Sequence, residues 1–388
     1  MKRIAIHDFG GHPFTLQLAE ALSHNGYKVA YFYTSANDAP NVGQMSGNDS
    51  VELIDIQFEK FQKQNFVKRK FQEMAYGKVA VKALREWEPD VLISNTAPVD
   101  SQITISKWAK KYSVRHIFWF QDIVAHAAKD ILTQKLGFVG GLIASNLART
   151  ERRIVQMADF VINISEPFKE QCLEWGVPAS KQVIQPNWPV INRLPLRPKI
   201  NEWSIKQDLQ DKFVFLYSGT LGFKQRPELM VQLAEEFVSF KDIRIVIVSS
   251  SIGVKWIEEQ KEVKSLSNLI LFPFQPFEDI PDVMGAADVL VTIQTAEAGK
   301  FCVPSKVLSY LCAGRSQLLA INSDNQAALM VHESESGVVV NPDDDKAFLD
   351  GAMRLYKEQV PNNARAFAEK SFDINSIVKR FEKILDDR

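Results

Sequence analysis

The sequence has few cysteines, almost no net charge and no long apolar run, and each absence excludes a class of protein. Its 388 residues include only three cysteines, whose spacing matches neither a disulfide framework nor a zinc site. The formal net charge is -1, so the chain lacks the excess of Lys and Arg on which nonspecific nucleic-acid binding depends. No stretch reaches the roughly 20 consecutive apolar residues that a membrane-spanning helix requires.

The amino terminus is too short in apolar length to be a signal peptide. The stretch Met1–Ile6 turns polar at His7 and Asp8, which is the pattern of a first buried strand. Together with the few cysteines, this pattern favours a reducing compartment. We therefore expect a cytoplasmic protein, whose contact with the inner face of the membrane, if it has one, is peripheral.

Length and composition predict two ordinary globular domains. Apolar residues make up 46% of the chain and charged residues 24%, and 388 residues exceed the roughly 100 to 200 of one domain. An apolar strand, a glycine turn, a helical pattern and a second strand occur first over residues 4–33 and again over residues 213–248. This order is the βαβ unit of a parallel sheet, so we predict two doubly wound α/β domains.

A proline-marked stretch at residues 186–198 separates the two halves. In open parallel sheets, ligands bind beyond the carboxyl ends of the strands, at the glycine turns. Two such domains therefore predict a ligand cleft between them.

Glycine turns at two strand ends could accept an anion. Gly11 follows the first strand, where a missing side chain lets a ligand approach the backbone at the start of a helix. A purely structural turn explains Gly10 and Gly11 equally well, and the absence of the G-x-G-x-x-G pattern counts against a nicotinamide cofactor. Gly219 repeats the arrangement in the second half, with Lys224 and Arg226 close behind it.

The motif Pro304-Ser305-Lys306 begins a helical pattern that ends at Gly314, with Ser305 as the expected N-cap. A cation in the first turn opposes the helix dipole by roughly 0.3 to 1 kcal/mol, and a bound anion would reverse the sign of that contribution. A solvated lysine that tolerates the penalty is the alternative. Combined with the glycine turns, Lys306 favours a ligand with two phosphates, and no acidic cluster for a metal accompanies it.

Further motifs are Gly10-Gly11, Met157–Ser165, Gly176–Lys181, Pro186-Asn187-Trp188, Ala286–Val289 and Ala313-Gly314-Arg315. In order and spacing, these motifs resemble the retaining glycosyltransferases of family 4, which have the GT-B fold. Pro304-Ser305-Lys306 is similar to the branch of that family that builds bacterial surface polysaccharides.

The resemblance implies a GT-B fold with two Rossmann-like domains that face a central cleft. The acceptor domain would span residues 1–190 and the donor domain residues 195–371, and a C-terminal helix over about 372–388 would pack back onto the first domain. The implied donor is a nucleoside diphosphate sugar, which we expect to be UDP-linked, as in UDP-glucose or UDP-N-acetylglucosamine. The implied acceptor is a polysaccharide or lipid-linked saccharide. Neither a metal nor another cofactor is expected. A catalytically degenerate nucleotide-binding or partner-binding relative and a GT-B nucleotide-sugar epimerase are the alternatives.

The resemblance also assigns donor-binding residues. Gly11 would lie near the donor phosphates or sugar, and the backbone near Phe274 and Gln275 would meet the base. Thr220 stands where the family usually has Arg, whereas Ser309 and Phe301 stand where it has a pair of Glu residues. The expected donor site consists of Gly11, Gly219, Thr220, Lys224, Phe274, Gln275, Pro304, Ser305, Lys306 and Ser309.

Gln121, Asp122 and His126 are the candidate catalytic residues. Gln121 stands where many members of the family have a His that contacts the transferred sugar. Asp122 and His126 follow a buried strand, and a carboxylate there could stabilise positive charge on the sugar ring or take the acceptor proton. The alternatives are that Asp122 caps a helix and that His126 is a helix residue without a catalytic part.

The segment 60–85 combines eight Lys and Arg residues with the single acid Glu73 and three Phe residues, Phe61, Phe66 and Phe71. If it is helical, it could lie on an anionic bilayer, with its cations at the headgroups and its Phe rings in the interface. A solvated helix face with its Phe residues in the core is the alternative. We expect a peripheral membrane contact through this segment.

Overall fold

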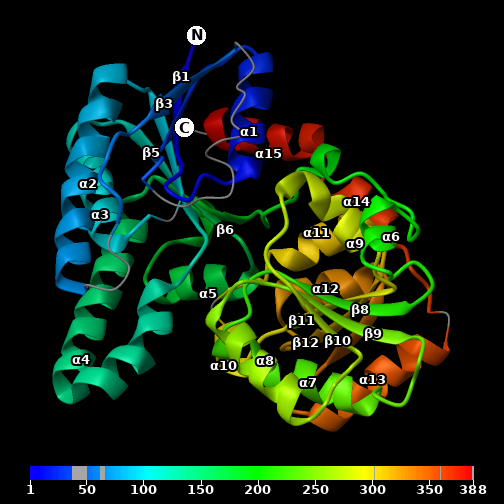
Figure 1. Ribbon diagram of the computed structural model, residues 1–388. Helices are drawn as coiled ribbons and strands as arrows, with labels where there is room; N and C mark the ends of the chain where they lie inside the picture. Colours follow the sequence, from blue (N-terminus) through cyan, green and yellow to red (C-terminus); the bar gives the residue numbers. More distant parts are fainter. Residues whose placement is uncertain (37–49, 62–65, 96, 301, 359, 387–388) are drawn as a thin grey trace. The chain divides into compact units, whose positions relative to one another are not determined.

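The chain forms two compact units, Met1–Trp188 with Ile374–Arg388, and Pro189–Asp373 (Figure 1). They are taken from a computed structural model that describes residues 1–36, 50–61, 66–95, 97–300, 302–358 and 360–386. Each unit is a parallel β-sheet with helices on its faces, which confirms the predicted fold class of two Rossmann-like domains.

The first unit contains a seven-stranded sheet, in the order β3-β2-β1-β4-β5-β6-β7 over its described residues. Its strands are β1 Arg3–His7, β2 Lys28–Tyr33, β3 Val51–Asp55, β4 Val91–Asn95, β5 Arg115–Phe120, β6 Phe160–Asn163 and β7 Gln182–Ile184. Its helices are α1 Pro13–His24, α2 Phe66–Trp87, α3 Val99–Lys111, α4 Val124–Met157, α5 Glu166–Glu174, the 3₁₀ turn η1 Ala179–Lys181 and α15 Ile374–Asp386.

Figure 1 shows α2 and α3 on one side of this sheet and α1 with α15 on the other. The central strand β4 is buried along its whole length, as expected for a strand that helices cover on both faces. The C-terminal helix α15 packs its Phe381 ring against Trp119, with 5.2 Å between the ring centroids. Lys2 and Arg115 donate hydrogen bonds to the carbonyl of Leu385, so two cations satisfy the C-terminal end of α15.

The second unit contains a six-stranded sheet, in the order β10-β9-β8-β11-β12-β13 over its described residues. Its strands are β8 Phe213–Ser218, β9 Ile243–Val248, β10 Leu269–Phe272, β11 Val289–Ile293, β12 Ser316–Ala320 and β13 Gly337–Val340. Its α-helices are α6 Glu202–Lys206, α7 Pro227–Glu236, α8 Ile252–Val263, α9 Ile280–Gly285, α10 Ala296–Gly299, α11 Lys306–Ala313, α12 Gln326–Glu333, α13 Asp345–Lys357 and α14 Ala364–Ser371. The 3₁₀ turns are η2 Ile191–Arg193, η3 Phe223–Gln225 and η4 Phe277–Asp279.

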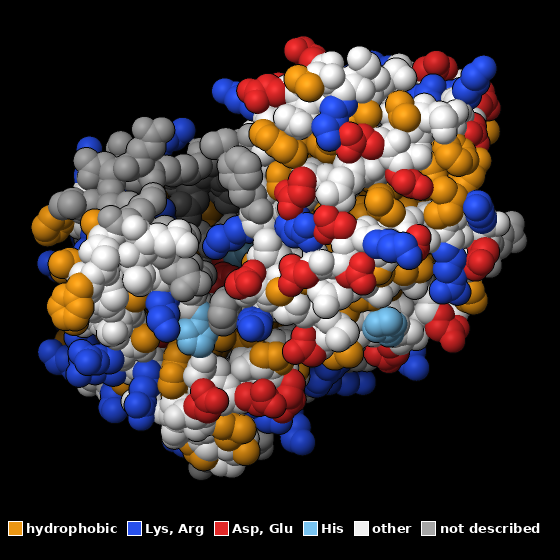
Figure 2. Space-filling model, turned by 90° about the horizontal axis from the view of Figure 1, so that it is seen from below, with side chains coloured by type: hydrophobic (Ala, Val, Ile, Leu, Met, Phe, Trp, Pro, Cys, Tyr) orange, Lys and Arg blue, Asp and Glu red, His pale blue; other side chains and the backbone are white. Residues whose placement is uncertain are grey.

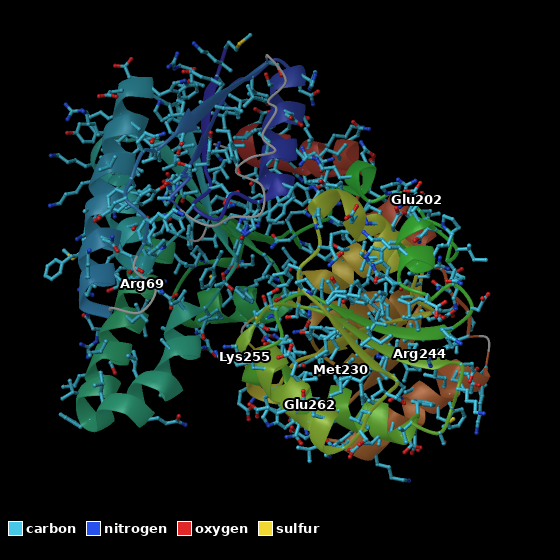
Figure 3. All side chains as sticks on the ribbon, viewed as in Figure 1. Arg69, Glu202, Met230, Arg244, Lys255 and Glu262 are labelled. Carbon is cyan, nitrogen blue, oxygen red and sulfur yellow. The ribbon has the colours of Figure 1, made fainter. Side chains whose placement is uncertain are left out.

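The core of the second unit lies between its sheet and the helices α7 and α13, as shown by the contacts of Leu229, Met230 and Phe348 with the strand residues Phe215 and Ile245. Figure 3 labels Met230 on α7, and its side chain is fully buried.

Both sheets reverse their strand order beside their first strand. In the first unit the chain builds outward from β1 through β2 to β3 and then returns to β4 on the other side of β1. In the second unit it builds from β8 through β9 to β10 and returns to β11. Such a switch point leaves a crevice at the carboxyl ends of the two central strands, and ligands of open α/β sheets bind there. The loops after β1 and β8 are therefore the expected positions of a ligand site.

The basic segment forms the predicted helix over Phe66–Trp87, but the prediction that its aromatic rings face a membrane is wrong for Phe61. The Phe61 ring packs inside the unit against Phe9, Phe58 and Tyr76. Only Phe71 among the three rings is described as exposed, with 68% of its surface open.

The positive charge of this segment is also partly neutralised. Arg69 pairs with Glu73 along the helix, and Lys70 pairs with Asp100 on α3. The Nζ atom of Lys82 lies 3.9 Å from Oε1 of Glu86. The segment is therefore a solvated helix face over much of its length. Residues 62–65 lie outside the described part of the chain, as does the side chain of Phe66.

Candidate functional site

Lys306 and Gly219 come together at the switch point of the second unit. Gly219 follows β8 with φ of 124°, which favours glycine. A Cβ at Gly219 would lie 3.3 Å from both Cε and Nζ of Lys306. The missing side chain thus leaves room for the lysine at the end of the strand, so two residues that the sequence places 87 positions apart form one site.

The start of α11 is held against the end of β8 by Tyr310. Its hydroxyl accepts a hydrogen bond from the N–H of Ser218 at 2.9 Å and donates one to the carbonyl of Ser218 at 3.2 Å. Tyr310 lies four residues after Lys306, so the two side chains stand on the same face of the helix. This contact fixes where the lysine side chain emerges.

The Lys306 ammonium group is buried and has no anionic partner among the described residues. Its Nζ atom lies 3.4 Å from the centroid of the Tyr217 ring and makes no hydrogen bond with any part of the chain that is described. Burial lowers the pKa of Lys306 to about 7. A buried ammonium without a counterion is unfavourable unless a ligand supplies the negative charge. The prediction of an anion at Lys306 thus gains a physical basis stronger than the helix dipole.

The loop after Gly219 is held by its own hydrogen bonds. The carbonyl of Thr220 accepts a hydrogen bond from the Tyr217 hydroxyl at 2.7 Å, and the N–H of Gly222 donates to Oε1 of Gln225 at 2.8 Å. The side chain of Lys224 is exposed on η3, five residues after Gly219. Lys224 therefore stays a candidate for the diphosphate.

Arg226 is not available for a phosphate, although its position suggested one. Its guanidinium pairs with Glu228 at 2.8 Å and with Asp345 at 2.7 Å, and it also donates to the carbonyl of Pro342. These contacts tie the start of α7 to α13. Arg226 is therefore a structural residue, and the prediction that it stands beside a phosphate is wrong.

The N-terminus of α11 offers backbone donors, but not through the cap that the sequence predicted. Ser305 stands at the N-cap position with helical φ and ψ, and its side chain makes no capping hydrogen bond. The N–H groups of Val307 and Leu308 close turns on the carbonyls of Pro304 and Ser305. Within the described chain, no hydrogen bond is formed by the N–H of Ser305. Ser309 lies three residues after Lys306 on the same helix, whereas Phe301 lies outside the described residues.

Phe274 and Gln275 follow β10, two strands away from β8. The Phe274 ring is 52% exposed, and its N–H donates to the hydroxyl of Ser250 at 3.1 Å. The Gln275 amide accepts a hydrogen bond from the Trp203 indole at 3.2 Å and donates one to the carbonyl of Pro273. Their place at the same edge of the sheet as Gly219 is compatible with contact to a base, which stays a prediction.

In the first unit, Asp8 occupies the backbone donors that were expected to serve a ligand at Gly11. Its buried carboxylate accepts hydrogen bonds from the N–H groups of Gly10, Gly11 and His12, at 3.0, 3.1 and 2.6 Å. The N–H of Gly11 is therefore already used within the protein. What Gly11 retains is a φ of 63° and a missing side chain, so it can allow close approach but does not hold an anion by that N–H.

His12 is a candidate functional residue that the sequence motifs did not indicate. Its Nδ1 lies 2.9 Å from Oδ1 of Asp8, and Gly10 leaves room for the ring, because a Cβ there would lie 2.2 Å from its Cε1. Burial lowers the pKa of His12. The charge and hydrogen bond of Asp8, together with the charge of Asp122, raise this pKa by more than burial lowers it, so the net shift is upward. The surroundings of His12 thus favour the protonated form of its imidazole. The spacing of Asp8 and His12 across a glycine turn was the signal available in the sequence.

Asp122 follows β5 and is not the cap of the helix after it. The N-cap position belongs to Ile123, and the buried Glu151 supplies the capping carboxylate by accepting hydrogen bonds from the N–H groups of Val124 and Ala125, both at 2.9 Å. The alternative reading of Asp122 as a helix cap is therefore wrong. Glu151, which was not predicted from the sequence, caps this helix instead.

The pKa of Asp122 depends on its desolvation and on the charge of His12. Desolvation by its surroundings raises the pKa of Asp122, while the charge of His12 lowers it, with a net upward shift. Its side chain is exposed to solvent, whereas the preceding Gln121 is 7% exposed. Asp122 also lines a small pocket with Gln102 and Glu151. The carboxylate thus meets solvent at the carboxyl edge of the sheet.

His126 lies in the first turn of α4. Burial lowers its pKa, Lys129 lowers it further, and Glu174 opposes these effects. The charged groups that influence His126 are therefore different from those around His12 and Asp122. Its catalytic role stays a prediction, with less support from its surroundings than that of Asp122.

Neither a metal-binding cluster nor a membrane-spanning helix occurs in the described part of the chain. No group of three or more His, Cys, Asp or Glu side chains that could hold a metal ion occurs among the described residues. Within the same residues, no helix is long and apolar enough to cross a membrane.

Comparison with known families matches both units. Residues 9–188 match the family described as "Glycosyl transferase 4-like domain", and residues 199–373 match "Glycosyl transferases group 1". The chain is also 24% identical over 306 residues to an Escherichia coli (strain K12) protein described as "Putative colanic acid biosynthesis glycosyl transferase WcaI". That match covers 77% of this chain and 74% of the relative.

Solved structures share the fold at low sequence identity. Sucrose-phosphate synthase from Thermosynechococcus elongatus is similar with a TM-score of 0.74 and 15% identity, over 99% of this chain and 98% of that chain. HepE from Anabaena, in complex with UDP-glucose, is similar with a TM-score of 0.72 and 16% identity, over 99% of each chain. With a family match in each unit, the chain is a glycosyltransferase of family 4 with the GT-B fold.

Proposed function

We propose that this enzyme moves a hexose from a UDP-sugar to a saccharide or lipid-linked acceptor, with retention of the anomeric configuration. The observation that carries the proposal is the buried ammonium of Lys306, which lies beside the side-chain-free Gly219 and lacks a counterion among the described residues. A diphosphate at this point would supply that charge. The retaining stereochemistry rests on the resemblance to family 4.

On the donor side, Lys306 would stabilise the departing diphosphate. Negative charge grows on the phosphate oxygens as the glycosidic bond breaks, and a fixed cation in a site of low polarity stabilises that charge better than water does. Bound diphosphate would raise the pKa of Lys306 from about 7, so that the lysine is fully charged when it is needed. The exposed Lys224 and the N–H of Ser305 would add donors, and we propose that no metal takes part.

On the acceptor side, we assign the proton transfer to Asp122. Its carboxylate must be ionised to take a proton from the attacking hydroxyl, and the His12 cation favours the ionised form. His12 therefore acts as a positioning residue that tunes Asp122, while Asp8 holds His12 in place.

The choice of a UDP-sugar draws support from the fold and from a relative. HepE, which shares the fold, was crystallised with UDP-glucose. The E. coli relative is described as a colanic acid biosynthesis glycosyl transferase, which supports a polysaccharide or lipid-linked acceptor.

A thermal-shift panel of UDP, GDP, ADP and NAD with purified protein tests the donor class, because a ligand that binds only the folded state raises the melting temperature. We expect UDP to give the largest shift, and a shift with NAD alone would contradict the proposal. NMR of the products formed from UDP-glucose or UDP-N-acetylglucosamine then tests the chemistry. Transfer with an α-configured product supports it, a changed sugar without transfer identifies an epimerase, and UDP binding without turnover identifies a degenerate relative.

A further inference from the structure

Helix α4 is bent into a hairpin that extends away from the sheet of the first unit (Figure 1). Gly137 interrupts the helix with φ of 55° and ψ of -132°, a combination open to glycine only. Three residues later, a Cβ on Gly140 would lie 1.9 Å from the carbonyl oxygen of Leu132. Two glycines thus allow a sharp reversal and a close approach of the two arms, with residues 133–139 at the tip.

The tip presents large apolar side chains to solvent. Phe138 is 82% exposed and Leu142, one turn later, is 56% exposed. The small residues Gly140 and Ala144 are buried, so the second arm turns its small side chains inward and its large ones outward. A soluble surface rarely keeps such a patch without an interaction that covers it. We define the apolar tip as Leu136, Phe138, Val139, Leu142 and Ile143.

Cations flank the apolar tip. Lys129 on the first arm and Arg149, Arg152 and Arg153 on the second are exposed and form no ion pair with the described residues. At 1.5 Å per residue, Lys129 lies about 12 Å and Arg149 about 18 Å from Gly137 along the two arms. Among the side chains of α4 that are described, the one acid is Glu151, which is buried as the cap of the first arm.

Exposed cations also occur at the start of α2. Figure 3 shows Arg69 at the end of α2 that lies toward the α4 hairpin, and Lys68 and Lys70 beside it are exposed, but Arg69 pairs with Glu73 and Lys70 with Asp100, so their charge is partly neutralised. Figure 2 is viewed from the side on which the hairpin extends, and its left-hand part shows hydrophobic side chains beside Lys and Arg side chains.

We propose that the apolar tip of α4 inserts into the surface of an anionic lipid bilayer. Apolar side chains would enter the boundary between headgroups and acyl chains, roughly 5 to 10 Å deep, while cations further along the arms meet the negative headgroups. A second copy of this chain fits less well, because pairing two tips would bring the unpaired cations of both copies together. The insertion is separate from donor chemistry, and it relocates the expected membrane contact from segment 60–85 to α4.

Vesicle flotation without donor or acceptor tests the proposal. We expect the full chain to float with vesicles of phosphatidylethanolamine and phosphatidylglycerol but not with neutral phosphatidylcholine vesicles. The double variant Phe138→Ser, Leu142→Ser should bind the anionic vesicles at least about tenfold more weakly, as expected for two lost apolar anchors. Lys129→Gln should weaken binding about fivefold, the effect of one cation near an anionic surface. Val263→Ser, at a position that is 78% exposed in the second unit, is the matched control and should bind like the original protein.

A probe at the tip separates insertion from indirect effects. Phe138→Cys carrying an environment-sensitive dye should show a blue shift with anionic vesicles, whereas Val263→Cys with the same dye should not. Circular dichroism and the UDP-induced thermal shift of each variant report on folding and donor binding. Equal flotation with neutral and anionic vesicles, or unchanged binding by the folded double variant, would overturn the proposal. A tip variant that changes only the oligomeric state in gel filtration would also overturn it, in favour of a second copy.

Discussion

Replacing Lys306 with Met should stabilise the unliganded enzyme while removing its donor binding. The pKa of Lys306 falls from 10.5 to about 7, and at 1.36 kcal/mol per pKa unit the charged form costs up to about 5 kcal/mol. Attraction to the Tyr217 ring offsets about 2 kcal/mol of this penalty. Methionine keeps the length of the side chain and carries no charge, so the free energy of unfolding at pH 7 should rise by up to about 3 kcal/mol.

The pH dependence of this gain follows from the direction of the shift. In the folded protein Lys306 loses its proton near pH 7, whereas in the unfolded chain it keeps it up to the ordinary pKa of 10.5. The penalty is therefore complete below about pH 7 and fades as the pH rises toward 10.5. The stability difference between Lys306→Met and the original protein should shrink over the same range.

Urea unfolding at pH 7 and at pH 9.5, without nucleotide, measures both quantities. Lys346→Met is the matched control, because the Lys346 side chain is 87% exposed and its loss should change stability by less than about 0.5 kcal/mol. If Lys306→Met unfolds at the same or lower urea concentration than the original protein at pH 7, the account of a desolvated, uncompensated ammonium is wrong.

Three further predictions concern Gly219, His12 and His116. Gly219→Ala should destabilise the second unit by about 1 to 3 kcal/mol, because the φ of 124° at this position disfavours a side chain. It should also reduce the UDP-induced thermal shift, because the new Cβ would press on Lys306. An unchanged UDP-induced shift in the folded variant would argue against the site. His12→Gln should raise the pKa of Asp122 and move the acid limb of the kcat/KM profile to higher pH, whereas a merely structural role would lower the rate without moving that limb. Burial lowers the pKa of His7 and of His116 to about 4, so the melting temperature should fall as the pH drops from 6.5 to 4, and this fall should be smaller in His116→Gln.

Regular features of the fold could be predicted from the sequence because they depend on local patterns. Strands such as β4 and β8 begin with apolar runs, glycines follow β1 and β8, and the helix from Lys306 ends at Gly314 with φ of 63°. These patterns specify the parallel sheets and the loops at their switch points. Local patterns are sufficient here because hydrophobic periodicity and backbone conformation depend on residues that are close in the sequence.

Partner choice between distant residues could not be predicted. No local pattern indicates that Asp8 accepts a hydrogen bond from the N–H of Gly11, that Glu151 caps the helix after Asp122, or that Arg226 pairs with Asp345. Each of these contacts joins a charged group to a donor or an opposite charge on another element or loop position, and one sequence without geometry offers many such partners. The exposed tip of α4 was missed for a related reason, since an apolar run inside a helix is read as core until its burial is known.

Calorimetric titration with UDP tests whether Lys306 and Gly219 form the donor diphosphate site. The original protein, Lys306→Ala and the control Lys346→Ala are compared at pH 7 after circular dichroism has shown that all three are folded. Loss of a charged contact worth roughly 1.5 kcal/mol or more should weaken UDP binding of Lys306→Ala at least about tenfold, with Lys346→Ala unchanged. Equal UDP affinity of Lys306→Ala and the original protein would contradict the assignment of the site.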